Sequence, residues 1–304
     1  MRVVSVINYK GGVGKTMLVA NLAAYVASKG KRVLMIDLDP QASLTFSFFP
    51  VQEIREFFLQ NKTILTFFSN QLRGALRSSL ADIIVPWTSD SNVSIDIICS
   101  HLGLIDSDIA IGAAISRARL KELGFLRWHT CLCNALKAIA DKSNYDLVLI
   151  DCPPNFYTIV KNAITASDYC LVPAKMDFLS TLGVMKLDES IKAYTTQYNK
   201  YVNGHGKGIY SRLSTKILGV VPTMVTIQRG AENIQLHKKY RDILETKGYA
   251  LLPQIRYNAT IFGAAPENYQ YNPIVLSSPT NAQERTIKSE LEKLGDDFIK
   301  SAEI

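Results

Sequence analysis

The first sixteen residues constrain the fold more than any other stretch of the chain. Residues 3–7 are almost all β-branched, with Ser5 as the one polar side chain, which predicts a strand buried on both faces of a sheet. The segment Lys10-Gly-Gly-Val-Gly-Lys-Thr16 follows, and residues 17–27 have the apolar spacing of a helix. A strand, a glycine-rich turn and a helix together favour phosphate binding, because successive backbone N–H groups and the positive end of the helix attract phosphate oxygens.

The side chains of this loop favour a nucleotide held with Mg²⁺. Lys15 is expected to reach the β- and γ-phosphates, and the Thr16 hydroxyl is expected to ligate Mg²⁺. The remaining residues expected around the phosphates are Gly11, Gly12, Val13, Gly14 and Met17. The alternative is a simple glycine turn with two incidental lysines, which the flanking strand and helix disfavour.

The loop departs from the ordinary phosphate-loop pattern in one informative way. Tyr9 stands where that pattern has a glycine, and a second lysine, Lys10, directly precedes the glycine pair. This is the deviant Walker A motif, and the chain closely resembles the ParA/MinD family of ATPases, on its ParA/Soj side. The resemblance implies that Lys10 is catalytic and crosses a dimer interface to the nucleotide of the other subunit. A salt bridge to a nearby carboxylate is the alternative for Lys10.

Two further apolar runs each deliver acidic residues to the carboxyl end of a strand. Residues 33–36 lead into Asp37-Leu-Asp39, and residues 145–150 lead into Asp151 and then two prolines. In open α/β sheets this edge is where ligands bind. The resemblance implies that Asp37 and Asp151 support the Mg²⁺ shell, that Asp39 positions the attacking water, and that ATP is the nucleotide. Candidates near the base are Met224 and Pro253.

The order of the predicted elements indicates an α/β fold: a mostly parallel twisted sheet with helices on both faces, of the P-loop NTPase type. Residues 1–304 are expected to form a single ATPase domain, with a helical insertion at about 44–91 and a loop insertion at about 201–213. Other predicted strands are 93–98, 168–172 and 217–221, and other predicted helices are 104–123, 125–140, 179–198, 230–246 and 281–302. The resemblance covers nearly the whole chain but is absent across 44–91.

Charge and composition narrow the possible partners. A net charge of +7 is a mild preference for polyanions. Candidate DNA-binding residues are Arg229, Lys238, Lys239 and Arg256, each with a solvated surface residue as the alternative. No stretch reaches the length of a spanning helix, and acids outnumber bases in residues 290–304, which disfavours membrane attachment. The five cysteines are expected to be reduced core residues, as in a cytoplasmic protein.

These features, with the resemblance, imply a Mg-dependent ATPase that dimerises with ATP, binds DNA non-specifically and partitions a plasmid or chromosome on the nucleoid. A ParB-like protein or cargo adaptor is the expected partner that stimulates hydrolysis. No helix-turn-helix segment precedes the phosphate loop, so operator-specific binding is not expected. The alternatives are an ATPase of the same fold that positions a non-DNA cargo, a MinD-like membrane-associated ATPase, and a scaffold that binds ATP without turning it over.

Overall fold

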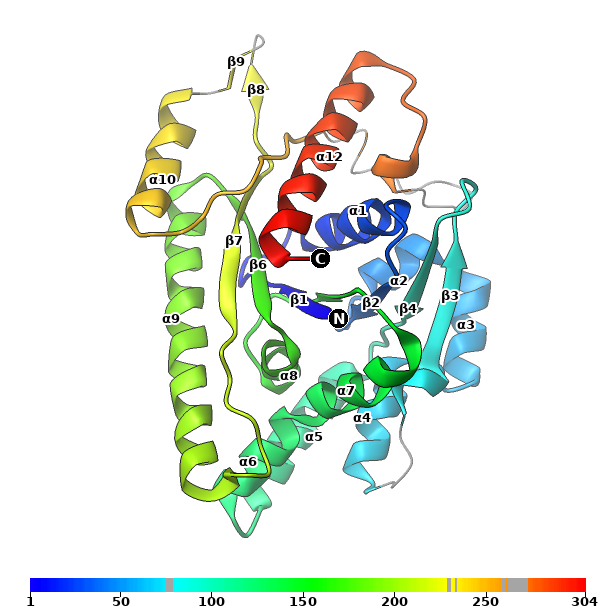
Figure 1. Cartoon of the computed structure of the whole chain (residues 1–304), viewed down its shortest axis with the longest axis vertical. Helices are drawn as coiled ribbons and strands as arrows, with labels where there is room; N and C mark the ends of the chain where they lie inside the picture. Colours follow the sequence, from blue (N-terminus) through cyan, green and yellow to red (C-terminus); the bar gives the residue numbers. More distant parts are fainter. Residues whose placement is uncertain (75–78, 229–230, 233, 259–260, 262–272) are drawn as a thin grey trace.

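The computed structural model describes residues 1–74, 79–228, 231–232, 234–258, 261 and 273–304. A seven-stranded sheet forms the centre of the molecule, with strand order β3-β4-β2-β5-β1-β6-β7 (Figure 1). All neighbouring strands are parallel except the edge strand β3, which is antiparallel to β4. The strands are β1 (Arg2–Val6), β2 (Val33–Asp37), β3 (Ile84–Thr88), β4 (Ser94–Ile98), β5 (Leu147–Asp151), β6 (Tyr169–Lys175) and β7 (Lys216–Thr223).

Helices cover both faces of this sheet, because alternate side chains of the buried strands point into two separate cores. In β2, Leu34 and Ile36 face one core, whereas Val33 and Met35 face the other. The first core is closed by α4 (Ile64–Leu72), α5 (Leu104–Arg117), α6 (Lys121–His129), α7 (Cys131–Ser143), α8 (Thr158–Ala166) and α9 (Phe178–Tyr201). The second is closed by α1 (Lys15–Ser28), α2 (Ser43–Phe48), α3 (Val51–Leu59) and α12 (Ala282–Ala302). The α/β fold class predicted from the sequence is confirmed.

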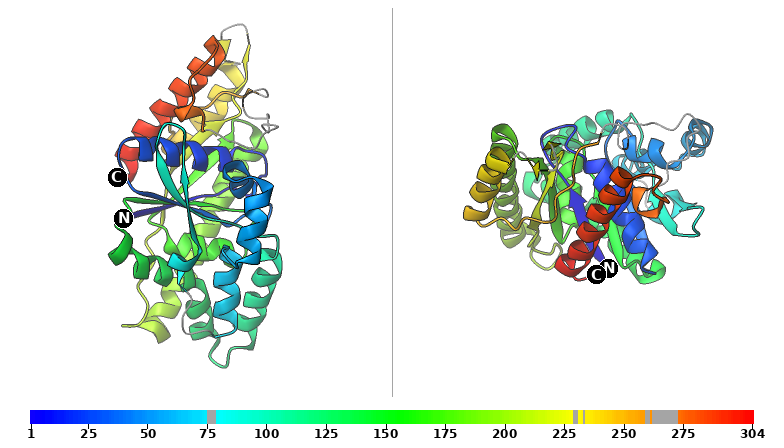
Figure 2. Two further views of the ribbon diagram at one scale, coloured as in Figure 1. Left: turned by 90° about the vertical axis from the view of Figure 1, so that its right-hand side faces the viewer. Right: turned by 90° about the horizontal axis from the view of Figure 1, so that it is seen from above.

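The last helix brings the two ends of the chain together. α12 packs on α1, and Gly295 provides the close approach, since a Cβ there would lie 2.1 Å from the ring of Tyr25. The side chain of Arg2 pairs with that of Glu303. Figures 1 and 2 accordingly show the N- and C-termini side by side.

Three stretches differ from the elements expected from the sequence. The predicted helical segment 44–91 ends in a 3₁₀ turn (Leu80–Ile83) and the strand β3, which lies at the edge turned toward the viewer in the left panel of Figure 2. The two helices expected over 104–140 are three, α5, α6 and α7. α10 begins at Ile234, after the short strands β8 (Ile227–Gln228) and β9 (Ala231–Glu232).

The segment 201–213, expected as a loop insertion, begins as a π turn (Val202–Gly206) that extends α9. The end of the segment is bound to α9 by Asn199, whose side chain donates to Leu213 O at 3.0 Å and accepts from Leu213 N at 2.8 Å. A further 3₁₀ turn, Ile274–Leu276, precedes α12.

The strand register brings the acidic residues of the sequence to one edge. Asp37 at the end of β2 pairs with Asp151 at the end of β5, and Val6 at the end of β1 pairs with Asp151 on its other side. The phosphate loop leaves β1 at this same edge. Three segments distant in sequence therefore meet where parallel α/β sheets bind ligands.

Candidate functional site: a nucleotide pocket at the carboxyl edge of the sheet

The glycine loop forms an open cradle at the start of α1. Gly12 and Gly14 have φ angles of +66° and +85°, in the left-handed region that side chains disfavour. A Cβ at Gly11 or Gly12 would meet nothing within 4 Å, so the loop faces open space. The rear of the loop is anchored, since Thr223 Oγ1 donates to Val13 O at 2.8 Å and Val13 is fully buried. The backbone N–H groups are thus held around a space suited to phosphate.

Lys15 and Thr16 lie at the base of this cradle. Burial lowers the pKa of Lys15, an effect that Asp151 and Asp39 partly oppose through their charges. Its Nζ lies 3.4 Å from Lys10 O. The Thr16 hydroxyl donates to Asp151 Oδ2 at 2.7 Å. Both side chains line the cavity that the glycine loop faces, where a lysine could bind phosphate and a hydroxyl could ligate magnesium.

Asp151 fits a role in holding a hydrated divalent cation. The side chain is buried, and its Oδ1 has no hydrogen-bond partner among the residues that the structure describes. Burial raises the pKa of Asp151, and the neighbouring Asp37 raises it further. A cation or its bound water would satisfy the orphaned oxygen and offset the cost of ionising it. No group of three or more His, Cys, Asp and Glu side chains gathers as a metal cage within the described ranges, so the donors would be a hydroxyl, phosphate oxygens and water.

Asp37 shapes the turn that follows β2. Its Oδ2 accepts from the backbone N–H of Thr45 at 2.9 Å and from the Thr45 hydroxyl at 2.8 Å, and its Oδ1 accepts from Asp39 N at 3.1 Å. Burial raises the pKa of Asp37 to about 7. The sequence predicts Asp37 as support for the Mg²⁺ shell, and in the structure its oxygens hold the segment that carries Asp39.

Asp39 faces the cavity from that turn. Its Oδ1 accepts from Gln41 N at 2.9 Å, and its backbone oxygen accepts from the Ser100 hydroxyl at 2.7 Å. The cavity has a volume of about 490 Å³. Its wall includes seven residues predicted from the sequence for the phosphates, the magnesium ion and the attacking water: Gly11, Gly12, Gly14, Lys15, Thr16, Met17 and Asp39. The structure therefore brings these residues together.

The apolar residues that line the cavity include Met17, Met224 and Ile255. Met224 has a φ of +56°, a left-handed conformation unusual for its type, and it follows directly on β7. Pro253, expected near the base, is not among the described residues that line the cavity. Ile255 takes that place, because its N–H donates to Pro222 O at 2.8 Å and sets it against the end of β7.

Several lining residues were not singled out from the sequence. Those from α1, the turn after β2 and α2 are small or polar: Ala20, Gln41, Ser43 and Ser47; Ile261 also lines the cavity. Pro154, the second of the two prolines noted after Asp151 in the sequence, lines it as well. The usable signals were the positions of Gln41 and Ser43, within four residues after Asp39, and of Pro154, three residues after Asp151. Ala20 and Ser47 reach the wall because they lie on α1 and α2.

Lys10 forms a salt bridge with a nearby carboxylate, which is the alternative role expected for it from the sequence. Its Nζ lies 3.1 Å from Asp177 Oδ2 and donates to Ser180 Oγ at 3.0 Å. Asp177 also caps α9 by accepting from Ser180 N at 2.7 Å. The ion pair is part-exposed, at 39% for Lys10 and 42% for Asp177. Lys10 thus lies at the surface beside the first turn of α9 rather than over its own phosphate cradle.

The structure describes three of the four candidate DNA-binding residues. Lys238 and Lys239 are exposed on α10 (Ile234–Thr246), which packs beside α9. Arg256 lines the nucleotide cavity, and its guanidinium lies 2.7 Å from Glu290 Oε1 on α12. Arg229 lies outside the described residues. All five cysteines are free, as predicted; Cys99, Cys152 and Cys170 are buried, whereas Cys131 and Cys133 are half-buried on α7 rather than in the core.

Comparison with known proteins agrees with this geometry. A family model described as an AAA domain matches residues 1–203. The chain is 30% identical over 199 residues to the sporulation initiation inhibitor protein Soj of Bacillus subtilis. This alignment covers 65% of the chain and 68% of Soj. It is 29% identical over 259 residues to the chromosome partitioning protein ParA of Caulobacter vibrioides, covering 84% of this chain and 81% of ParA.

Solved structures share the fold at lower identity. A plasmid partition protein of Borrelia burgdorferi bound to AMPPNP has a TM-score of 0.62 at 21% identity and covers 98% of each chain. The cobyrinic acid a,c-diamide synthase of Mycobacterium smegmatis, solved with an ATP analogue and magnesium, has a TM-score of 0.61 at 23% identity and covers 85% of this chain and 88% of that one. With the deviant Walker A loop and its acidic partners in place, the chain belongs to the ParA/MinD family of P-loop ATPases, on its ParA/Soj side.

Proposed function

We propose that this chain is a Mg-dependent ATPase of the ParA type, which dimerises with ATP, binds duplex DNA non-specifically and positions a plasmid or chromosome with a partner protein. The observation that carries the ATPase part is the 2.7 Å contact between the Thr16 hydroxyl and Asp151, whose other oxygen is buried without a partner among the described residues. This pair lies directly under the open glycine cradle. It fits a nucleoside triphosphate and Mg²⁺ better than a bare phosphate.

The roles of the side chains in hydrolysis follow from their places. The glycine loop and Lys15 bind the phosphates and fix their orientation. Asp39 faces the cavity and orients the attacking water, while Asp37 holds Asp39 by its backbone N–H. Mg²⁺, when bound, offsets negative charge on the phosphate oxygens.

Dimerisation through the face that carries Lys10 is supported by an apolar patch beside it. Phe178, Leu179 and Leu182, in the first turns of α9, are 59%, 69% and 43% exposed. Exposed apolar side chains that gather in one patch are typical of protein interfaces. A second subunit placed there would cover this patch and bring its own Lys10 toward the nucleotide.

DNA binding is supported by the net charge of +7 and by the exposed Lys238 and Lys239 on α10. Arg256 contributes less to this surface, because its guanidinium is bound to Glu290. Contacts of this kind go to phosphates, so binding should be independent of sequence and strongly salt-dependent. Within the described residues, no helix is long and apolar enough to cross a bilayer.

The test is binding to random-sequence duplex DNA with ATP and with ADP across a salt series. Wild type should bind with ATP and release at high salt, whereas Lys238→Glu/Lys239→Glu should bind at least tenfold more weakly. The matched control is Arg55→Glu/Lys62→Glu, which changes the net charge equally at exposed residues of another region and should bind as wild type does. The variant Arg229→Glu, at the remaining candidate DNA-binding residue, is measured in the same assay.

Four outcomes would redirect the proposal. Equal loss in the control variant would show that only net charge matters. Absence of DNA binding with every nucleotide would favour a same-fold ATPase that positions a non-DNA cargo, and binding to anionic vesicles instead would favour the MinD-like alternative. ATP binding without turnover would favour a nucleotide-switched scaffold.

A further inference from the structure

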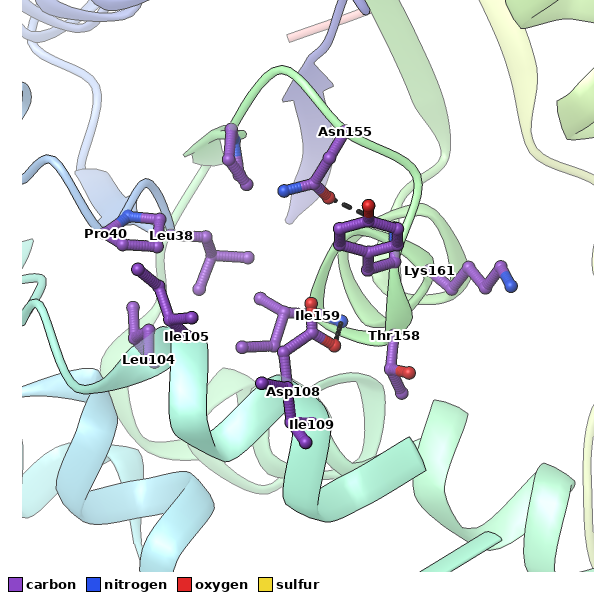
Figure 3. A pocket seen from close by; sticks show the side chains of 12 residues that line it. Leu38, Pro40, Leu104, Ile105, Asp108, Ile109, Asn155, Thr158, Ile159 and Lys161 are labelled. Carbon is purple, nitrogen blue, oxygen red and sulfur yellow. Dashed lines mark hydrogen bonds between the residues drawn. The ribbon is translucent and has the colours of Figure 1, made fainter. Parts of the chain in front are cut away.

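A polar cavity of about 440 Å³ lies beside α4, between the end of α3 and the segment after β4. The lining residues that matter below come from these segments: Phe58, Asn61, Ser69, Asn70, Arg73 and His101. By contrast, the cavity of about 520 Å³ between α5 and α8 is mostly apolar (Figure 3). The polar cavity is called the α4 cavity below.

The α4 cavity is separate from the nucleotide pocket. Among the residues that the structure describes, none lines both cavities. Most of the wall of the α4 cavity comes from residues 44–91, which carry none of the family motifs found in the sequence. A ligand of this cavity is therefore a different molecule from the nucleotide held by the glycine loop.

His101 offers the α4 cavity a hydrogen-bond donor whose tautomer is fixed. Its Nδ1 accepts from Gly103 N at 2.9 Å, and its ring packs edge-on against Phe58, with the two ring centres 4.3 Å apart. Burial lowers the pKa of His101 below its ordinary value of 6.5, so the ring is neutral at pH 7. A neutral imidazole that accepts at Nδ1 carries its proton on Nε2. The N–H that His101 can give to a ligand is thus Nε2–H.

Arg73, the residue directly after α4, gives the cavity its charge. Within the described part of the chain, its guanidinium forms no ion pair and no hydrogen bond. No Asp or Glu is found among the described residues that line the cavity. The wall therefore carries a positive charge that is not neutralised by a neighbouring carboxylate, which favours an anionic ligand.

Neutral polar side chains surround this charge. The side-chain amides of Asn61 and Asn70 and the hydroxyl of Ser69 line the cavity, and none of them forms a hydrogen bond to another described residue. With Arg73 and His101 they can donate to more oxygens than the two of a carboxylate. A phosphate monoester has three terminal oxygens and up to two negative charges, so it matches this set of donors better.

The size of the cavity favours an organic phosphate over the inorganic ion. Sites for small molecules have volumes of about 300–1,000 Å³, and the α4 cavity lies in this range. The half-buried ring of Phe58 lies on the wall and offers an apolar contact to a ring or chain attached to the phosphate. An inorganic phosphate would leave this contact unused.

We propose that the α4 cavity binds a small phosphate monoester. Arg73 and His101 Nε2–H hold the phosphate oxygens, with Asn61, Asn70 and Ser69 as further donors, and the organic group packs against Phe58. This site goes beyond the proposed ATPase and does not rest on it, because it needs neither the glycine loop nor turnover of ATP.

The test is isothermal titration of the full chain with phenyl phosphate, inorganic phosphate and benzoate. Wild type is titrated with AMPPNP and Mg²⁺ present, so that the glycine loop is filled, and Lys15→Ala is titrated without nucleotide. The variants are Arg73→Gln and His101→Phe, the second of which keeps an aromatic ring beside Phe58. The matched control is Arg55→Gln, an exposed arginine on α3 that does not line the cavity. Circular dichroism shows that each variant is folded.

Phenyl phosphate should bind wild type with a Kd below about 1 mM, at one site per chain. It should bind Arg73→Gln at least tenfold and His101→Phe at least fivefold more weakly, and Arg55→Gln and Lys15→Ala as it binds wild type. Inorganic phosphate and benzoate should each bind at least tenfold more weakly than phenyl phosphate.

Four results would overturn the site. They are no binding of phenyl phosphate, equal binding to Arg73→Gln, benzoate binding as tightly as phenyl phosphate, and loss of binding in Lys15→Ala, which would place the ligand in the nucleotide pocket. A chain that hydrolyses ATP but gives one of these results refutes the α4 site alone. A chain that binds phenyl phosphate as expected but hydrolyses no ATP refutes the proposed ATPase and leaves the α4 site standing.

Discussion

Replacing Lys10 by alanine separates a structural role of this lysine from a role in hydrolysis. In the structure Lys10 pairs with Asp177 and Ser180, and both members of the ion pair are about 40% exposed. A pair this accessible to water contributes at most about 1 kcal/mol to the free energy of unfolding. If Lys10 also neutralises charge on the transferring phosphoryl group, its loss should lower the rate of hydrolysis by about 10²- to 10³-fold.

Asp177→Asn provides the complementary variant. An asparagine keeps a side-chain oxygen that can accept from Ser180 N and cap α9, but it removes the charge that holds Lys10. We expect Asp177→Asn to change turnover by less than about fivefold, because it frees Lys10 rather than deleting it. Lys192→Ala is the matched control: it removes an ion pair of 2.7 Å on the same helix, to Asp188, far along the chain from the loop.

The assay is steady-state phosphate release with saturating ATP and Mg²⁺, together with urea unfolding of the same proteins. The reasoning is refuted if Lys10→Ala and Asp177→Asn lower turnover equally, since the ion pair itself would then be the functional unit. It is also refuted if Lys10→Ala unfolds with a loss of several kcal/mol.

Two further predictions concern buried titratable groups. Burial lowers the pKa of His129 to about 3 from an ordinary value of 6.5, so below pH 6.5 the unfolded chain binds a proton that the folded chain does not, and stability falls as pH falls. Between pH 7 and pH 5 this residue should account for a loss of about 2 kcal/mol in the free energy of unfolding. Urea unfolding of His129→Phe should therefore show a loss that is smaller by that amount over the same pH range. The same pH dependence in the variant and in wild type would contradict the prediction. Asp151→Asn should abolish the rise in Tm that MgATP gives, yet raise the Tm measured in EDTA at pH 8, because burial penalises the ionised carboxylate. A Tm in EDTA below that of wild type would count against this assignment, with Asp146→Asn as an exposed-carboxylate control.

The phosphate-binding half of the site was predictable because its residues are adjacent in the chain. A buried strand, glycines and a helix impose the loop locally, so Gly11 to Thr16 could be placed without the rest of the fold. The positions of Asp37, Asp39 and Asp151 at strand ends were also predictable, since each follows an apolar run typical of a buried strand, and their roles were implied by the resemblance. The register then brings Asp37 opposite Asp151.

Other features depended on contacts between distant segments. The sequence predicts a helical region where the structure has the edge strand β3. This strand contains Pro86 and gains its conformation by pairing with β4, which no local pattern indicates. Ile255 rather than Pro253 lines the cavity, because of a backbone hydrogen bond to Pro222 that no local pattern indicates. Arg256 has the sequence context of a free surface cation, but in the structure it forms an ion pair with Glu290 of α12, which is distant in sequence.

The sequence by itself determined the fold class, the phosphate loop and the acidic residues at the strand ends, because these follow from short-range patterns of apolar, glycine and acidic residues. Only the tertiary structure decided that Lys10 is held at the start of α9. It also decided that alternate residues of the segments after β2 and β5 line two different cavities, the nucleotide pocket and a mostly apolar cavity between α5 and α8 (Figure 3). In an extended backbone neighbouring side chains point in opposite directions, and which cavity each one meets depends on the helices packed there.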